Sequence, residues 1–198
     1  MSPDLVDRTR LRASLERIAS EAANDRASHV ARPWVSARLE RDTIAVSNFT
    51  QFRVEHEFRA DESVERGGHD SAPSPLRYLL SSIAFCVLGW CAKTWAAADV
   101  PVHRLEADVR TRLDLRGEHR VGEVPPHPTW FVLELRVDDE TDADHATSLA
   151  REAVDRCPVS ALIARAVPVH LIVVHHGATV LDERPDELRS EHREEQTR

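Results

Sequence analysis

Cysteine and glycine are scarce in this chain, and each scarcity excludes a class of protein. The 198 residues include three cysteines, which are too few for a scaffold stapled by disulfides. Their odd number favours thiols that stay free in a reducing compartment. Six glycines and eleven prolines exclude a collagen-like or glycine-rich chain. The composition, with 41% hydrophobic and 30% charged residues, is instead that of a globular protein.

The chain also lacks a surplus of positive charge and any uninterrupted apolar run of bilayer length. Arginine and lysine number 26 against 34 acidic residues, a net charge of −8, so we expect no nucleic-acid partner. No apolar run approaches the roughly 18 to 20 residues of a membrane span, so we expect neither a spanning helix nor a membrane partner. Residues 1–17 are too charged for a secretory signal, and we therefore expect a cytoplasmic protein.

What is present is a sequence that switches between helical and strand periodicity. Apolar residues at helical spacing predict three helices, at about residues 3–24, 75–98 and 141–156. Alternation of apolar and polar residues predicts strands within 29–59, at 105–115, 131–137 and 167–175. This order is typical of an α+β fold with antiparallel sheet rather than of alternating βαβ units.

The second helix is the predicted centre of the fold. Ser74 can cap it, and Pro75 suits its first turn, where the missing N–H has no partner within the helix. Its apolar residues spread around much of the circumference, so we expect most of this helix to be buried. The third helix carries a pattern like a capping box at Thr141 and Asp144, and Cys157-Pro158 ends it.

The cysteines are the first candidates for chemistry, although each of them has a plain structural alternative. Cys86 lies within the long helix, and Cys157 follows the third helix. A free cysteine is often a small buried residue that only packs, and this interpretation fits Cys91 best. The eleven histidines form no HxxxH pattern and no CxxC occurs, so we expect no metal site. Phosphate-binding loops and GxSxG motifs are absent from the sequence as well.

Two cysteine-centred segments resemble the OsmC/Ohr family, named for osmotically inducible protein C and the organic hydroperoxide resistance proteins. The first is GGHDSAPSPLRYLLSSIAFC, which ends at Cys86, and the second is DRCPVSALIARAVPV, which contains Cys157. The intervening ADVPVHRLEADVRTRLDLRG is also similar to the family. The resemblance extends over about residues 35–175 and is closest to the less characterised OsmC-like branch.

The resemblance implies an OsmC-like α+β fold in which antiparallel sheets wrap two long central helices of an intertwined homodimer. It divides the chain into a helical extension at residues 1–28, an OsmC-like domain at 29–177 and a charged, solvated tail at 178–198. It also places the active sites at the subunit interface.

The activity that the resemblance implies is the reduction of organic hydroperoxides by a thiol peroxidase. By position, Cys86 resembles the peroxidatic cysteine and Cys157 the resolving cysteine. A peroxide would oxidise Cys86 to a sulfenic acid, and Cys157 would condense with it to a disulfide. No resident cofactor is expected, because an external dithiol, of the lipoyl type in this family, would reduce the disulfide.

Cys86 needs a nearby cation if it is to ionise, because burial raises the pKa of a thiol. It lies about three turns into its helix, beyond the reach of the partial charges at the helix N-terminus. Peroxidases of the family use an arginine held by a glutamate, and Leu76 occupies the position of that glutamate here. Arg59 is our first candidate for the cation, ahead of Arg66 and Arg53.

The residues leave a second function open, in which the fold is kept without catalysis. The missing glutamate favours an OsmC-like dimer that binds a small apolar or thiol-reactive ligand at its interface. Retention of both cysteine positions favours the peroxidase. If Pro158 begins a short helix, Cys157 is its N-cap, and we then expect Cys157 to be the more readily ionised thiol of the two.

Overall fold

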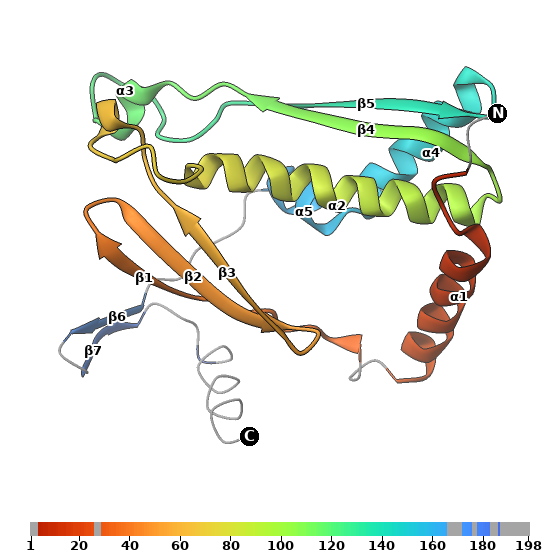
Figure 1. The fold of residues 1–198 in the computed structure, drawn as a ribbon, viewed down its shortest axis with the longest axis horizontal. Coiled ribbons are helices and arrows are strands. Elements are labelled where there is room, and N and C mark those ends of the chain that lie inside the picture. The colour runs from red at the N-terminus through yellow and green to blue at the C-terminus, as the bar shows by residue number, and fades with distance from the viewer. Residues whose placement is uncertain (1–3, 26–28, 166–171, 176–177, 183–185, 187–198) are drawn as a thin grey trace. The chain divides into compact units, whose positions relative to one another are not determined.

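The computed structural model describes residues 4–25, 29–165, 172–175, 178–182 and 186 (Figure 1). The chain divides into a large unit, Met1–Ala161, and a small one, Leu162–Arg198. The large unit contains both predicted active-site cysteines. Each unit is described by itself below.

The large unit mixes helices with two antiparallel sheets. Its helices are α1 (Arg8–Asn24), α2 (Pro75–Ala97), α3 (Leu115–Glu118), α4 (Ala143–Arg156) and the start of α5 (Pro158–Ile163). One sheet has the order β1–β2–β3, with β1 at Ser36–Arg41, β2 at Ile44–Gln51 and β3 at Val54–Ala60. The other pairs β4 (Val102–Thr111) with β5 (Phe131–Asp139). The predicted α+β class with antiparallel sheet is therefore confirmed.

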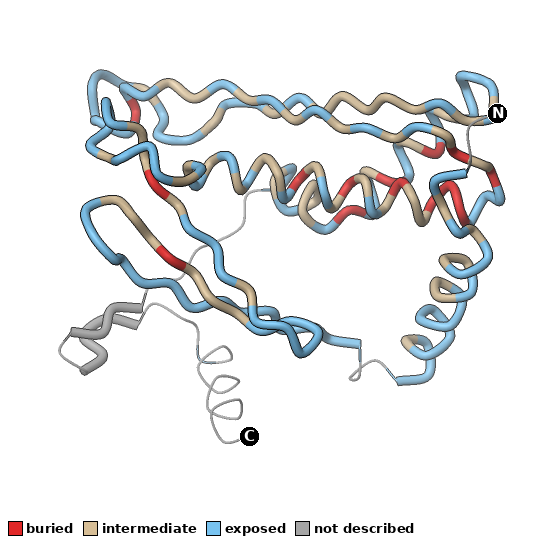
Figure 2. Tube along the Cα trace, in the orientation of Figure 1, coloured by how far each residue is buried: buried red, intermediate tan, exposed pale blue. Residues whose placement is uncertain are grey.

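Helix α2 lies between the two sheets of this unit and contributes more buried residues than any other described element (Figures 1 and 2). Pro75 occupies the first turn as predicted, and Ser74 has the extended backbone of an N-cap, although its side chain makes no capping hydrogen bond. The buried side chains lie on the face that packs against β4 and α4: Ile83, Val87, Cys91, Thr94 and Trp95. Trp95 also donates its indole N–H to Asp139 of β5 at 2.6 Å.

The expectation that most of α2 is buried is not met within one chain. Phe85 is 72% exposed and Leu79 is 40% exposed, although both belong to the apolar pattern of the helix. On β3, Phe58 is also exposed. The apolar pattern around the helix is therefore wider than the core that a single copy of the chain forms.

Helix α2 also corrects the exclusion of a membrane span. It is long and apolar enough, by length and composition, to cross a bilayer, with a mean hydropathy of 1.4 in its most apolar stretch. Arg77 and Lys93 interrupt the apolar residues of α2, so the sequence contains no unbroken apolar run of this length. Length and composition are the same in the central helix of many soluble proteins, so this property does not place the chain in a membrane.

The N-terminal helix packs on the end of α2 through polar contacts. The backbone N–H of Leu5 donates to the carbonyl oxygen of Val102 at 2.8 Å. The Arg8 guanidinium donates to both the carboxylate and the backbone carbonyl of Asp99 at 2.7 Å. Helix α1 has no buried residue, so polar contacts rather than a core hold its start.

Three local predictions are corrected by the structure. Within the predicted strands of residues 29–59, apolar and polar residues alternate from Phe52 to Arg59, which predicts one strand, but Phe52 and Arg53 form the β2–β3 turn with φ of 52° and 64°. Asp142, not Thr141, caps α4 by accepting from the backbone N–H of His145 at 2.8 Å. Leu115 leaves the predicted strand and begins α3.

The small unit contains an antiparallel pair, β6 (Ile172–His175) and β7 (Ala178–Asp182). The predicted final strand is confirmed for its second half, and its first half lies outside the described residues. The segment predicted as a charged tail from residue 178 begins instead with β7. The rest of that segment, apart from Asp186, lies outside the described residues.

Candidate active site

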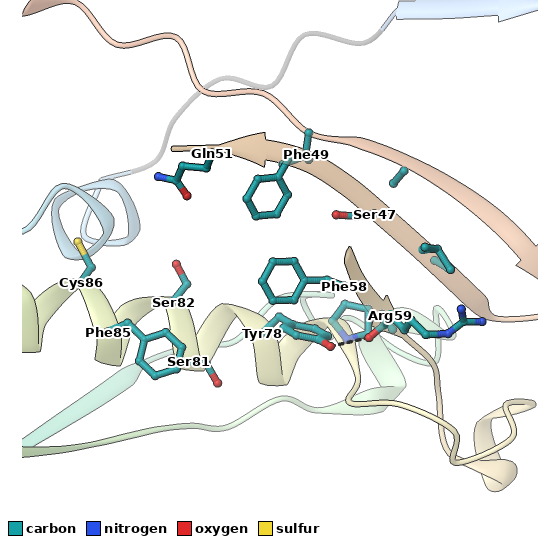
Figure 3. Close-up of a pocket in the computed structure, with 16 residues that line it drawn as sticks. Ser47, Phe49, Gln51, Phe58, Arg59, Tyr78, Ser81, Ser82, Phe85 and Cys86 are labelled. Carbon is teal, nitrogen blue, oxygen red and sulfur yellow. Dashed lines mark hydrogen bonds between the residues drawn. The ribbon is translucent and has the colours of Figure 1, made fainter. Parts of the chain in front are cut away.

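Cys86 is presented by α2 to an apolar pocket between this helix and the β1–β2–β3 sheet (Figure 3). The pocket has a volume of about 910 Å³. Aromatic rings from the sheet and the helix line it: Phe49, Phe58, Tyr78 and Phe85. Tyr78 and Phe58 meet edge to face, and the Tyr78 hydroxyl donates to the carbonyl oxygen of Arg59. Of the three cysteines, only Cys86 reaches this pocket.

Cys157 lies where α4 ends and α5 begins, and it is fully buried. As predicted, it is the N-cap of α5, because its Sγ accepts from the backbone N–H of Ser160 at 3.4 Å. The Ser160 hydroxyl oxygen is buried and has no hydrogen-bond partner among the described residues, and Ser160 lies near enough to Cys157 to lower the pKa of its thiol. Sequence reasoning missed Ser160, although its place in the CPVS run, at the third helical position, is a signal for it.

The two thiols, 71 positions apart in the sequence, lie near enough for each to shift the pKa of the other. Both are free cysteines. The packing of α4 against α2 brings them together. Proximity is one requirement of a disulfide-forming pair, and the sequence could state it only as an implication of the family resemblance.

The surroundings push the pKa values of the two thiols in opposite directions. Burial and the neighbouring Cys157 raise the pKa of Cys86, against attraction from the Val159 N–H and Lys93. Burial acts to raise the pKa of Cys157 too, but hydrogen bonds from Ser160 and from Cys86 outweigh it and lower that pKa. Cys157 is therefore the more readily ionised thiol, as the capping argument predicts.

The third cysteine has the properties of a packing residue. Cys91 is fully buried in α2, and burial together with the charge of Cys157 raises its pKa to about 11. At neutral pH it is a neutral thiol enclosed by the core. It does not line the pocket.

The three arginine candidates are placed away from Cys86 in the single chain. Arg59 lies on β3 at the pocket wall, but its guanidinium points away from the sulfur and pairs with Glu40 (Figure 3). Arg66 is held by two carboxylates, each at 2.8 Å, from Glu62 and Glu118. Arg53 is in the exposed β2–β3 turn. The role predicted for Arg59 therefore stays a prediction.

Leu76, at the position of the family's glutamate, faces a different part of the molecule from Cys86. It lines a small cleft with Leu80 of α2 and with Val109 of β4, on the side opposite the Cys86 pocket. Ten residues separate Leu76 from Cys86, which places their directions about 80° apart around the helix axis. The structure thus gives Leu76 an apolar packing role.

The loop that leads into α2 is organised by a buried carboxylate. Asp61 is 1% exposed and accepts from the hydroxyls of Thr43 at 2.6 Å and Ser71 at 2.7 Å. It also accepts three backbone N–H groups, from Glu62, His69 and Ser71. These hydrogen bonds, led by that from Thr43, hold the pKa of Asp61 well below its usual range.

The Gly67-Gly68 pair allows the same loop to close tightly. Gly67 has φ of 85°, and a Cβ at Gly68 would lie 1.9 Å from the carbonyl oxygen of Glu62. His69 follows and bonds through Nε2 to Asp42 at 2.8 Å, which ties the loop to the β1–β2 turn. His69 is not part of the pocket lining. No group of three or more histidine, cysteine or acidic residues able to hold a metal occurs in the described part of the chain.

Comparison with known proteins identifies the family. The family model for OsmC-like proteins matches residues 68–172, or 105 of the 198 residues. The chain belongs to the OsmC-like family. The matched region contains both Cys86 and Cys157, whereas Arg59 lies before its first residue. No curated protein matches the sequence of this OsmC-like protein.

Solved structures support the same fold for the OsmC-like protein. An OsmC-like protein from Mycoplasma pneumoniae matches with a TM-score of 0.56 and 14% identity, covering 68% of this chain and 88% of the other. An OsmC-like protein of unknown function from Vibrio cholerae matches with a TM-score of 0.53 and 9% identity, covering 67% and 93%. At these identities the likeness is one of fold.

Proposed function

We propose that this OsmC-like protein is a thiol peroxidase that reduces organic hydroperoxides through Cys86 and Cys157. One observation carries the proposal. The Cys86 thiol lines an apolar pocket and interacts electrostatically with the nearby, buried Cys157 thiol. The apolar wall favours an organic hydroperoxide over hydrogen peroxide, because the organic group gains from leaving water.

The first step is an attack by the Cys86 thiolate on the distal peroxide oxygen. An S–O bond forms and the O–O bond breaks. The alkoxide leaves with the bonding electron pair and takes a proton to become an alcohol. Cys86 is now a sulfenic acid, so its sulfur has been oxidised by two electrons and the peroxide reduced by two.

The second step joins the two sulfurs. The Cys157 thiolate attacks the Cys86 sulfenic sulfur, an S–S bond forms, and hydroxide leaves and is protonated to water. The interactions that lower the pKa of Cys157 favour this thiolate. An external dithiol, of the lipoyl type by family resemblance, then reduces the disulfide by two thiol–disulfide exchanges.

The experiment is to add cumene hydroperoxide to the reduced protein and count free thiols. The expected result is a loss of two thiols per chain. Cys86→Ser abolishes the loss, whereas Cys157→Ser stops at a sulfenic acid that dimedone traps on Cys86. Cys91→Ala is the matched control and still loses two thiols. Retention of all three thiols after incubation with excess hydroperoxide would contradict the proposal.

The alternative function is a non-catalytic dimer that binds an apolar or thiol-reactive ligand. Two observations favour it: Leu76 packs where the family has a glutamate, and Arg59 pairs with Glu40 rather than with Cys86. A ligand of this kind occupies the pocket without oxidising a thiol. Saturable binding of a fluorescent apolar probe, together with three unchanged thiols in the peroxide experiment, is its signature.

A homodimer is part of both functions. Exposed apolar side chains on α2 and β3, Phe85 and Phe58, support it, because such surfaces on soluble proteins commonly mark association sites. In such a dimer, groups from the second copy complete the pocket.

A further inference from the structure

The indole of Trp90 on α2 has two cations against it. Lys93 Nζ lies 4.6 Å from the ring centroid, and Arg156 Cζ lies 4.9 Å from it. A cation at this distance from an aromatic face is attracted by the electrons of the ring. Arg156 ends α4 directly before Cys157, so this cluster adjoins the cysteine pair.

The geometry of α2 directs Lys93 towards Cys86. Cys86, Trp90 and Lys93 are at positions i, i+4 and i+7, which places them along one face of the helix. Helical side chains lean towards the N-terminus, so the Lys93 stem extends back over Trp90 in the direction of Cys86. The contact of Lys93 Nζ with the Trp90 ring shows that the side chain takes this course.

Lys93 is also the cation of this cluster whose charge is not neutralised nearby. It forms no ion pair with any residue that the structure describes, whereas Arg156 pairs with Glu152 at 3.0 Å. Arg59, which reaches the pocket from β3, is neutralised by Glu40. The half-buried position of Lys93 limits screening by solvent.

We propose that Lys93, held on the indole of Trp90, is the cation that favours the thiolate form of Cys86. This assigns Lys93 a role that neither the family resemblance nor the sequence analysis gave it, with Trp90 as its positioning residue. The inference rests on the proposed function in taking Cys86 as the nucleophile.

The role of Lys93 concerns the proton that the two thiols share. The charged and titratable groups that face Cys86 among the described residues are Cys157 from the α4–α5 junction and Lys93 from α2. In the singly ionised pair, the negative charge rests on either sulfur. Attraction to Lys93 stabilises the form with the charge on Cys86, which is the sulfur that meets the pocket.

The test measures alkylation of Cys86 by iodoacetamide in a Cys157→Ser background, read by mass spectrometry between pH 6 and 10. The reagent is neutral, so Lys93 cannot steer it electrostatically. We expect Lys93→Met to slow alkylation at pH 7 by roughly three- to tenfold and to move the midpoint of the pH profile upwards. Lys93→Arg is expected to restore both, because it keeps the charge.

Trp90 provides the second measurement. Trp90→Leu removes the ring that holds the ammonium, so we expect a slowing smaller than that of Lys93→Met. The double variant is expected to be no slower than Lys93→Met alone, because the ring acts through the lysine. Trp90→Phe keeps an aromatic ring beside the Lys93 ammonium, so we expect Cys86 to be alkylated at close to the parent rate.

Two results would overturn the inference: a rate and midpoint in Lys93→Met equal to the parent's, or a Lys93→Arg variant as slow as Lys93→Met. Because Lys93 is the only lysine in the sequence, acetylation with an amine-selective reagent removes its charge without a mutation, and the alkylation experiment can be repeated on the acetylated protein. Lys93→Arg serves there as the blank for the N-terminal amine. No step uses a peroxide, so failure of the peroxidase proposal is distinguished from failure of this one.

Discussion

At the level of single residues, the surroundings of Cys86 and Cys157 shift the pKa values of two chemically identical thiols in opposite directions. Cys157 is buried but receives the Ser160 N–H and the Cys86 thiol as donors, so its pKa falls. Burial and the neighbouring Cys157 raise the pKa of Cys86. Cys157 is therefore the more readily ionised of the two thiols, and Cys86 is the one that lines the pocket.

The first prediction concerns the Ser160 hydroxyl. In a Cys86→Ser background, Ser160→Ala should raise the pKa of Cys157 by roughly half a unit to one unit, because the thiolate loses a donor while the backbone N–H stays. Thiolate absorbance at 240 nm measures the titration. Ser160→Thr is the matched control and should keep the parent value, whereas an unmoved midpoint in Ser160→Ala would show that the backbone N–H suffices.

At the scale of elements, the loop between β3 and α2 decides where the long helix begins. Asp61 accepts from both hydroxyl and backbone donors on the β1–β2 turn and on residues 62–71. Charged hydrogen bonds in a buried position stabilise more than exposed ion pairs do. The carboxylate of Asp61 therefore contributes to the placement of the pocket wall, of which Ala60 and Pro75 are part.

The second prediction is that Asp61→Asn lowers the free energy of unfolding by about 2–4 kcal/mol, measured by urea denaturation at pH 7. Since folding lowers the pKa of Asp61, its contribution is fully present above the unfolded value of about 4 and is lost as the pH falls below it. Stability of the variant should therefore fall less steeply between about pH 5 and 2.

Asp138→Asn, on β5, is the matched control for Asp61→Asn. Asp138 is 66% exposed and its nearest guanidinium, that of Arg104, is 3.9 Å away, so the change should stay within about 0.5 kcal/mol. Equal effects of the two substitutions would mean that Asp61 does not organise the loop.

At the scale of the whole molecule, the large unit leaves apolar surface uncovered around its central helix. Phe85 is 72% exposed on α2, and Leu39 of β1 is 68% exposed. Exposure of this extent on an element that also carries the core is costly in water. A second copy of the chain is the partner that the family resemblance implies.

The third prediction is that Phe85→Asp converts a dimer into a monomer, because it places a charge on this surface. Sedimentation velocity at micromolar concentration measures the change, with the unsubstituted protein expected to sediment as a dimer. Val121→Asp introduces the same charge at a residue 56% exposed in the α3–β5 connection, and it should leave the dimer intact. A monomeric unsubstituted protein would remove the homodimer from both candidate functions.

Much of the local structure was predictable because it depends on neighbours along the chain. Proline at the first turn and apolar residues at helical spacing define α2, and alternation defines β4 and β5. The errors are also local: the turn at Phe52 and Arg53 interrupts an alternation that continues through it. The alternation of apolar and polar residues predicts which side chains share a face of a strand, but it does not predict where a turn with positive φ ends the strand.

The α+β class, the central helix, the cap at Cys157 and the two candidate cysteines could all be predicted from the order of the residues. The proximity of the two thiols, the pairing of Arg59 with Glu40 and the contact of Lys93 with Trp90 became known only from the packed chain. The physical reason is that periodicity and capping act between residues a few positions apart. Contact between sulfurs 71 positions apart, and the carboxylate that each cation selects, depend instead on how whole elements pack.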